Sequence, residues 1–359
     1  MASFGNSVAR ASAAPAAPIH PQVIHAPAVP ARDHWIKRCV VNCARKLHDL
    51  PLTFPLVVKA FRALQGAGVN VTPNHFYWPV PDLEQLEKRD WPVYSFPPAS
   101  KFDLKQQIAF ARELAARYGD ECRFPDQAPD GEYHYHNGYF ESVDAEMAYG
   151  IVRHFKPRHI VEIGTGHSTR VLAAALQKNI ERDTIDGQLI SFDPDPEHCA
   201  PNCWSGHVEQ IPVAIQNVQL EFFDSLERND ILFIDSSHVV ATGSDVLREY
   251  LEILPRLNPG VLVHVHDIFL PSDYPRAAVL DNLWFWSEQY LLLAFLSFNS
   301  KFEVHWGSSA MQAQCPWVLD ECFPNWKHSY RRMPRSKRHF VPSADGDRVW
   351  PSSFWMRRV

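Results

Sequence analysis

Two segments of this chain place an aspartate close to a histidine directly after an apolar run. Asp235 is followed three residues later by His238, and His266 directly precedes Asp267. Carboxylate oxygens and imidazole nitrogens are ligands for divalent cations such as Mg²⁺ or Mn²⁺. Histidine also accepts a proton near neutral pH. The two segments therefore predict a metal site held by Asp235 and Asp267, a general base beside a hydroxyl acceptor, or both.

The histidines of these segments differ in their expected surroundings. Successive residues of a strand point to opposite faces, so His264 and His266 share one face of the second apolar run. His264 lies inside that run and is expected to be a hydrogen-bonded core residue. His238 lies past the end of its strand and is the predicted base, with His266 and Asp267 as further catalytic candidates. The alternative for His238 is a loop residue that caps the next helix, and Asp235 is expected to orient its ring.

The decamer HIVEIGTGHS at 159–168 has the pattern of a strand, a glycine turn and a helix. Its apolar, β-branched first half predicts a buried strand, and Ser168 is expected to cap the following helix. Gly164 and Gly166 let the backbone approach a ligand, and the helix N-terminus offers unpaired N–H groups. The segment predicts a cradle for a nucleotide-like cofactor, with Thr165 between the glycines.

The identity of the cofactor follows from the residues around the glycines. A dinucleotide-binding loop has the pattern G-x-G-x-x-G, and Thr169 stands at its third glycine. The pattern E-x-G-x-G-x-S, which begins at Glu162, resembles the first motif of class I S-adenosylmethionine-dependent methyltransferases. In that family the loop holds the methionine end of the cofactor. The resemblance implies further cofactor contacts from Asp193, which ends the next predicted strand beside the ribose hydroxyls, and from Asp235.

The spacing of Asp235 and His238 resembles that in metal-dependent sugar O-methyltransferases of macrolide biosynthesis. In those enzymes the aspartate binds the metal and the histidine acts as the base. Catechol-type O-methyltransferases also have metal-binding aspartates at the two strand ends that Asp235 and Asp267 occupy here. They continue with asparagine where this chain has Ile268. The resemblance implies a Mg²⁺ or Mn²⁺ site in which one ligand is missing or comes from elsewhere.

A wider resemblance extends over most of the chain beyond residue 70. Its segments are NHFYWPVPD (74–82), NGYF (137–140), EIGTGHST (162–169), FIDSSHVV (233–240), HDIFLPSDYP (266–275), EQYLL (288–292) and the C-terminal SSFW. Together they resemble a bacterial group of class I methyltransferases whose domain type is called methyltransferase 24. The resemblance implies the fold and the cofactor, and it leaves the methyl acceptor open.

Strands and helices alternate from residue 159 onward, which predicts a mostly parallel sheet with right-handed crossovers. The expected strands are 159–163, 188–193, 207–212, 231–236, 261–267, 302–307 and 352–359. The expected helices are 34–48, 55–65, 104–118, 142–155, 168–177 and 275–296. The fold class is α/β, a Rossmann-like class I methyltransferase with seven strands, and the resemblance implies that the last strand is antiparallel.

Composition divides the chain into three parts. Residues 1–33 are rich in alanine and proline and are expected to form a disordered tail. Residues 34–141 are expected to form a cap of helices and aromatic loops. Residues 142–359 form the predicted methyltransferase domain, in which the polar segment 308–351 is either a lid or a surface excursion.

Residues outside the predicted sheet are expected to complete the site. Six aromatic residues are candidates for the acceptor pocket: Tyr77, Trp78, Tyr135, Tyr139, Tyr274 and Trp286. Asn137 and Asp144 precede the sheet and are expected to reach the carboxylate or amine of the cofactor. The apolar stretch 275–296 is either core or a homodimer interface.

Charge and cysteine content restrict the class of protein. The net charge of −6, with no basic block before the C-terminal tail, argues against nucleic-acid binding. No apolar run reaches the roughly 18 residues that a membrane span needs. The seven scattered cysteines predict reduced thiols in a cytoplasmic protein.

These observations predict an S-adenosylmethionine-dependent O-methyltransferase. The expected acceptor is a hydroxyl or carboxyl group of a small molecule or saccharide. An NAD-dependent oxidoreductase and a non-catalytic binding module with the same fold are the alternatives.

Overall fold

The computed structural model describes most of the chain, in two compact units. The described residues are 54–70, 78–96, 102–129, 131–195, 207–339 and 341–359. The first unit is Met1–Trp78 and the second is Pro79–Val359. In the first unit, helix α2 (Phe54–Gly66) confirms the helix expected at 55–65. The expected tail at 1–33, the expected helix at 34–48 and Tyr77 lie outside the described residues.

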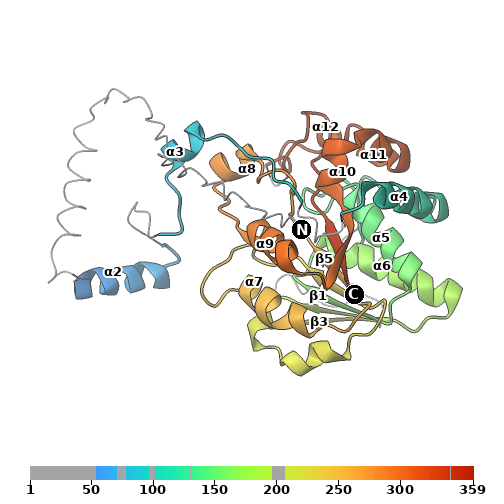
Figure 1. Ribbon diagram of the computed structural model, residues 1–359, viewed down its shortest axis with the longest axis horizontal. Coiled ribbons are helices and arrows are strands. Elements are labelled where there is room, and N and C mark those ends of the chain that lie inside the picture. Colours follow the sequence, from blue (N-terminus) through green and yellow to red (C-terminus); the bar gives the residue numbers. More distant parts are fainter. Residues whose placement is uncertain (1–53, 71–77, 97–101, 130, 196–206, 340) are drawn as a thin grey trace, which may run out of the picture. The chain divides into compact units, whose positions relative to one another are not determined.

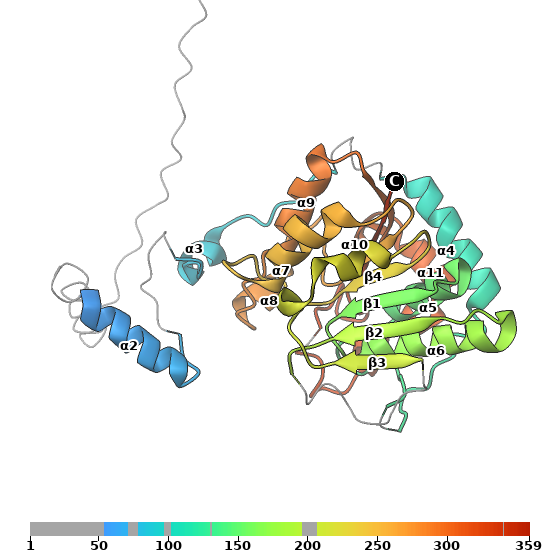
Figure 2. The same ribbon diagram turned by 90° about the horizontal axis from the view of Figure 1, so that it is seen from below.

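The second unit is built around a seven-stranded sheet with the order β3-β2-β1-β4-β5-β7-β6. The strands are β1 (His159–Ile163), β2 (Gln188–Phe192), β3 (Val208–Ile211), β4 (Ile231–Ile234), β5 (Leu262–Val265), β6 (Phe302–Gly307) and β7 (Phe354–Arg358). The first five strands pair in parallel, and Figure 2 shows β3, β2, β1 and β4 side by side in this order. Strand β7 runs antiparallel to both of its neighbours, β5 and β6. The Rossmann-like class and its antiparallel last strand are therefore confirmed.

Alternating side chains of the central strands enter two separate apolar clusters, one on each face of the sheet. Ile160 of β1 packs into the first cluster, and Val161 and Ile163 pack into the second. Helices α4 (Leu104–Tyr118), α5 (Asp144–Phe155) and α6 (His167–Asp183) contribute to the first. Helix α7 (Asp245–Arg248), the π-helical turn η5 (Glu249–Ile253) and α9 (Glu288–Phe298) contribute to the second. Figure 1 shows these two layers on opposite sides of the strands. Burial on both faces explains why the central strands are continuous apolar runs.

The expected single helix at 275–296 is wrong. The chain forms α8 (Arg276–Leu280), then a turn, and then α9. The turn contains Leu283 in the left-handed region, at φ 59°, and the backbone N–H of Trp284 donates to Ala278. Apolar content cannot distinguish one helix from two, whereas a polar pair such as Asp281-Asn282 favours a turn.

The remaining helices are short. They are α3 (Leu83–Lys88), α10 (Ser308–Gln314), α11 (Pro316–Cys322) and α12 (Ser329–Arg332), with the 3₁₀ turns η3 (Ile215–Asn217), η4 (Leu220–Ser225), η6 (Leu254–Arg256) and η7 (Pro324–Trp326). Four of these elements lie in the segment 308–351, where Met311, Val318, Leu319 and Trp326 are buried. The segment thus contributes to the apolar core despite its polar composition. Among the described residues, no helix is both long and apolar enough to cross a membrane.

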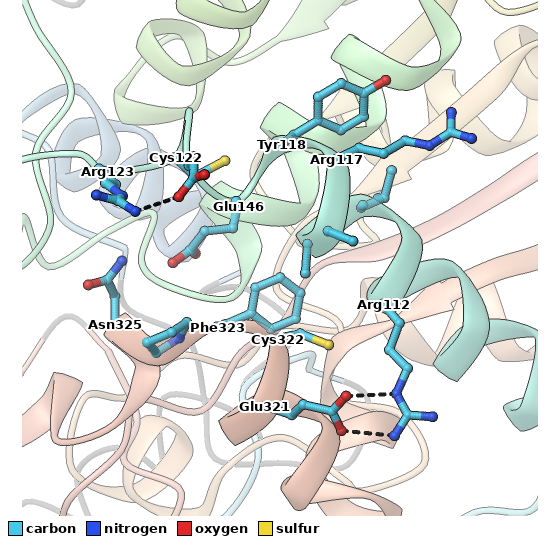
Figure 3. Close-up of a pocket in the computed structure, with 16 residues that line it drawn as sticks. Arg112, Arg117, Tyr118, Cys122, Arg123, Glu146, Glu321, Cys322, Phe323 and Asn325 are labelled. Atoms are coloured by element: carbon cyan, nitrogen blue, oxygen red, sulfur yellow. Dashed lines mark hydrogen bonds and ion pairs between the residues drawn. The ribbon is translucent and has the colours of Figure 1, made fainter.

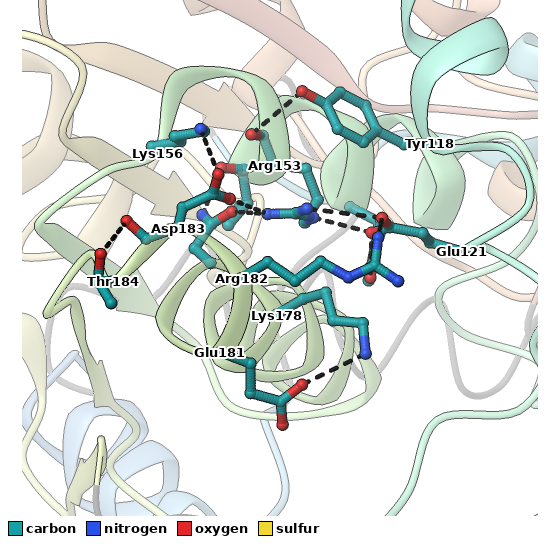
Figure 4. Close-up of polar contacts among 12 residues, drawn as sticks. Tyr118, Glu121, Arg153, Lys156, Lys178, Glu181, Arg182, Asp183 and Thr184 are labelled. Carbon is teal, nitrogen blue, oxygen red and sulfur yellow. Dashed lines mark hydrogen bonds and ion pairs between the residues drawn. The ribbon is translucent and has the colours of Figure 1, made fainter.

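An ionic cluster around the buried Arg153 joins α5 to α6 and to the segment that follows α4 (Figure 4). The Arg153 guanidinium lies 2.8 Å from the Glu121 carboxylate and 2.9 Å from that of Asp183. Each carboxylate also pairs with a second cation: Glu121 with Arg182, and Asp183 with Lys156. Because α6 follows the glycine loop directly, this cluster helps to hold the helix that supports the loop.

Candidate cofactor and catalytic site

The loop after β1 is held from beneath by a buried carboxylate. Glu162 accepts hydrogen bonds from the hydroxyls of Ser168, at 2.8 Å, and Thr169, at 2.7 Å. Its side chain has no exposed surface, and burial raises the pKa of Glu162 to about 8. Gly164 has φ +93°, and a Cβ there would lie 2.0 Å from the carbonyl oxygen of Asp235. Glycine is therefore required at this position, because the loop packs directly on the end of β4.

The second glycine has a different environment. A Cβ at Gly166 would meet no atom within 4 Å, and its φ of 179° is open to any residue. Helix α6 begins at His167 with Gly166 as its N-cap, so the expected capping by Ser168 is wrong. The Ser168 hydroxyl donates to the strand carboxylate instead. The backbone N–H of Thr165 donates to Asp193 at 3.0 Å, which joins the loop to the end of β2.

A cavity of about 680 Å³ opens beside this loop. Its wall contains residues of three kinds. The loop and α6 contribute Thr165, Gly166, His167, Ser168 and Arg170; the charged group is Asp235, His238, His266 and Asp267; the aromatic group is Tyr139, Trp284, Trp286 and Trp350. The cavity therefore brings together the predicted glycine loop and the predicted catalytic residues.

His238 lies at the centre of three carboxylates. Its Nε2 is 3.5 Å from both Asp235 and Asp267, and its Nδ1 is 2.9 Å from Oε2 of Glu288. Burial by itself would lower the pKa of His238, but the contacts with Asp235 and Glu288 and the charge of Asp267 outweigh it. The pKa is consequently raised well above the ordinary value. Glu288 was not among the predicted site residues, and its only signal in the sequence is the EQYLL segment of the wider resemblance.

The two histidines of β5 and its end have opposite roles. His264 is fully buried, lies 2.9 Å from the Ser353 hydroxyl and stacks on Phe233. Burial lowers the pKa of His264 well below its usual range, and the prediction of a core histidine is confirmed. His266 lines the cavity, with Nε2 3.9 Å from Asp267. Burial opposes its charge, but nearby aspartates raise the pKa of His266.

The residues proposed for a metal meet the chemical requirement only in part. Asp235 and Asp267 both face the cavity, and carboxylates are suitable ligands for Mg²⁺ or Mn²⁺. In the described part of the chain, however, no group of three or more His, Cys, Asp or Glu side chains has the arrangement of a metal site. The metal site therefore stays a prediction.

Like Asp193, two other residues expected to contact the cofactor hold the backbone in this structure. The Asn137 amide donates to and accepts from the backbone of Phe140, both at 2.9 Å, and so closes a turn. Asp144 borders the cavity, but its carboxylate accepts from the Ser308 hydroxyl and from the N–H groups of residues 352–353.

Two of the six aromatic candidates, Tyr139 and Trp286, line the cavity. Tyr274 is buried and packs edge-on against Trp286. Tyr135 is a core residue whose hydroxyl donates a hydrogen bond to Glu146. Trp78 belongs to the first unit. The structure adds two tryptophans that the sequence analysis did not select, Trp284 and Trp350.

A second cavity, of about 800 Å³, contains none of the predicted site residues (Figure 3). It lies between α4 and residues 321–325. Arg112 at its edge is held by two hydrogen bonds to Glu321, of 2.9 and 2.8 Å. We assign these contacts to the packing of α4 against α11.

Comparison with known proteins adds the following similarities. Residues 161–268 match the model of a family described as a methyltransferase domain. An uncharacterized protein of Archaeoglobus fulgidus is 29% identical over 167 residues, which cover 44% of this chain and 75% of that protein. The SAH-bound methyltransferase PaMTH1 of Podospora anserina has a TM-score of 0.38 and 10% identity, and covers 81% of this chain and 99% of its own. An O-methyltransferase from Bacillus cereus in complex with SAH has a TM-score of 0.32 and 14% identity, and the match covers 70% of this chain and 90% of that one. The family match runs from β1 past the end of β5, so the matched residues include the glycine loop, Asp235, His238 and Asp267.

Proposed function

We propose that this protein is an S-adenosylmethionine-dependent O-methyltransferase that acts on a hydroxyl group of a small molecule or saccharide. The observation that carries this proposal is the position of His238, in the wall of the same cavity as the glycine loop. The sulfonium donor is already activated. O-methylation therefore needs an aligned acceptor and a group that removes its proton.

The residues around the loop fit the donor. The open space at Gly166 lets a ligand approach the backbone, and the first turn of α6 offers N–H groups to its carboxylate. Thr165, Gly166 and Ser168 would contact the donor, and Asp193 would receive its ribose. Glu162 would act indirectly, because it holds the hydroxyls of the loop from beneath. When bound, the donor supplies an electrophilic methyl group.

His238 would take the acceptor proton at Nε2, the nitrogen on the side of Asp235 and Asp267. These carboxylates, together with Glu288, would stabilise the imidazolium that forms. His266 borders the same cavity and is the second candidate for the base. If Mg²⁺ or Mn²⁺ binds, Asp235 and Asp267 would hold it, and the ion would lower the pKa of the acceptor.

The aromatic wall supports an acceptor with a flat or apolar face. Trp286 lies 4.9 Å from the His238 ring, between centroids, and stacks on Trp284 at 4.6 Å. Such faces bind planar rings and the apolar side of sugars. An acceptor that rests on this wall would present its hydroxyl beside the base.

Substitution of the base tests the proposal. His238→Ala is expected to lower turnover on a hydroxyl acceptor by about 10²–10⁴, the usual contribution of a positioned base, with donor affinity nearly unchanged. Labelled donor incubated with a metabolite extract identifies an acceptor, and calorimetric titration measures donor affinity. His264→Ala is the control, because this core histidine should affect thermal stability rather than turnover in the folded protein.

A folded His238→Ala variant that retains wild-type turnover on a hydroxyl acceptor would contradict the assigned base. Transfer to carboxylic acids alone would contradict the hydroxyl acceptor, because a carboxylate needs no base. Failure of the wild-type protein to bind S-adenosylmethionine would contradict the proposed function as a whole.

A further inference from the structure

We propose that Glu288 is a positioning residue that fixes the tautomer and orientation of the His238 ring. The inference rests on the proposed function, in which His238 is the base. Oε2 of Glu288 lies 2.9 Å from Nδ1 of His238, and the Glu288 side chain has no exposed surface. A carboxylate only accepts hydrogen bonds, so this contact keeps the proton on Nδ1 and leaves Nε2 to the cavity.

The backbone around His238 is held by the same end of α9. The N–H groups of Ser287 and Glu288 both donate to the His238 carbonyl oxygen, at 2.9 and 3.1 Å. The Ser287 hydroxyl accepts from the N–H of Val240 at 2.8 Å. His238 itself has φ 60°, a conformation that non-glycine residues adopt only when the surroundings enforce it. The start of α9 therefore holds both the main chain and the ring.

The aspartates cannot replace Glu288 in this role. Asp235 and Asp267 each lie 3.5 Å from the other ring nitrogen, Nε2, and their side chains are 29% and 21% exposed. By themselves these two carboxylates would favour a proton on Nε2, and that tautomer cannot accept a proton from a hydroxyl at this position. A competing acceptor at Nδ1 is therefore needed, and Glu288 provides it.

Three substitutions test the inference in the full chain. Glu288→Leu removes the acceptor, and Glu288→Gln keeps one, because the amide oxygen still accepts from Nδ1–H. Gln289→Leu is the matched control: Gln289 is equally buried and accepts a hydrogen bond from the Phe269 N–H, and none of the hydrogen bonds found for it among the described residues goes to His238. All three variants are compared for kcat, for acceptor KM and for donor affinity.

We expect Glu288→Leu to lower kcat about tenfold or more, with donor affinity unchanged, and Glu288→Gln to restore most of the loss. Gln289→Leu should lower the melting temperature and leave kcat near the wild-type value. The double variant His238→Ala/Glu288→Leu should lose no more activity than His238→Ala, because Glu288 acts through His238. In the ¹⁵N spectrum of labelled histidine, recorded at a pH above the raised pKa of His238, the neutral ring should carry its proton on Nδ1 in the wild type and in Glu288→Gln.

Three results would overturn the inference. Equal loss of kcat in Glu288→Gln, Glu288→Leu and Gln289→Leu would mean that Glu288 is only structural. A further loss in the double variant would mean that it acts on something other than His238. A proton on Nε2 in the wild type would contradict it directly, even if Glu288→Leu fails to fold. Failure of the proposed function is a separate result, because the wild-type protein itself would then fail to bind S-adenosylmethionine.

Discussion

The two glycines of the loop show how neighbouring residues of one type can serve different purposes. Gly164 adopts a left-handed conformation, and any side chain there would collide with the carbonyl oxygen of Asp235. Gly166 has an extended φ and open space in the direction of a Cβ. Gly164 is therefore needed for folding, and Gly166 is available for binding.

Substitution at these two glycines separates folding from donor binding. Gly166→Val should leave the melting temperature close to that of the wild type and abolish donor binding, because its side chain would occupy the space beside the loop. Gly164→Ala should lower the melting temperature strongly, because the backbone of β4 must move. Thermal denaturation and calorimetric titration measure the two effects. Unchanged donor affinity in Gly166→Val would disprove the assignment of this loop to the donor.

Glu162 makes the free energy of unfolding depend on pH. Burial raises the pKa of Glu162 to about 8 in the folded protein, from the ordinary value of 4.5 for a solvated glutamate. Because the folded state binds this proton more tightly than the unfolded state, its stabilising contribution is full below about pH 4.5 and is lost as the pH rises through about 8. In urea unfolding, the wild-type midpoint should fall more steeply over this range than that of Glu162→Gln. Parallel curves for the two proteins would contradict the shift.

At the scale of elements, the turn between α8 and α9 is the feature that completes the site. It carries Trp284 and Trp286, and the next helix begins with Glu288 at the His238 ring. A continuous helix could not direct both tryptophans toward the cavity, because residues two apart on a helix point in different directions. The turn thus connects the aromatic wall to the base.

Removal of one aromatic ring tests the acceptor side of the cavity. Trp286→Ala should raise the acceptor KM roughly tenfold and leave donor affinity unchanged, because the ring packs beside the proposed base, His238. Trp317→Ala is the control, since Trp317 is 52% exposed and lies over Arg112, away from this cavity. Steady-state kinetics with the acceptor identified in the metabolite extract gives the acceptor KM, and calorimetric titration gives the donor affinity. If Trp286→Ala lowered only the donor affinity, Trp286 would contact the donor and not the acceptor, which would contradict this prediction.

At the scale of the second unit, the parallel strands bring distant segments to one edge. The ends of β1, β4 and β5 supply the loop, Asp235 and His266-Asp267. Another part of the wall comes from Val341, Pro342, Val349 and Trp350. In such sheets, ligands bind beyond the carboxyl ends of the parallel strands, where segments from distant parts of the chain meet. One cavity is therefore lined by residues that come from more than half of the chain.

Local patterns in the sequence were sufficient for the sheet and for much of the candidate site. Every expected strand is present, because apolar β-branched runs and glycine turns act over a few neighbouring residues. The same patterns identified the glycine loop, Asp235, His238 and Asp267, because residues that follow parallel strands must meet at one edge.

Contacts between distant residues were decided only by the tertiary structure. Glu288 lies 50 residues from His238, and no local pattern determines that their side chains meet. Asn137 had the right chemistry for a cofactor contact, but the turn it closes uses its hydrogen bonds. The sequence alone therefore determined the strands, the loop and the strand-end residues, whereas packing decided which of the polar side chains face the cavity. The physical reason is that backbone preferences are local, while burial and hydrogen-bond pairing depend on which surfaces the whole fold brings together.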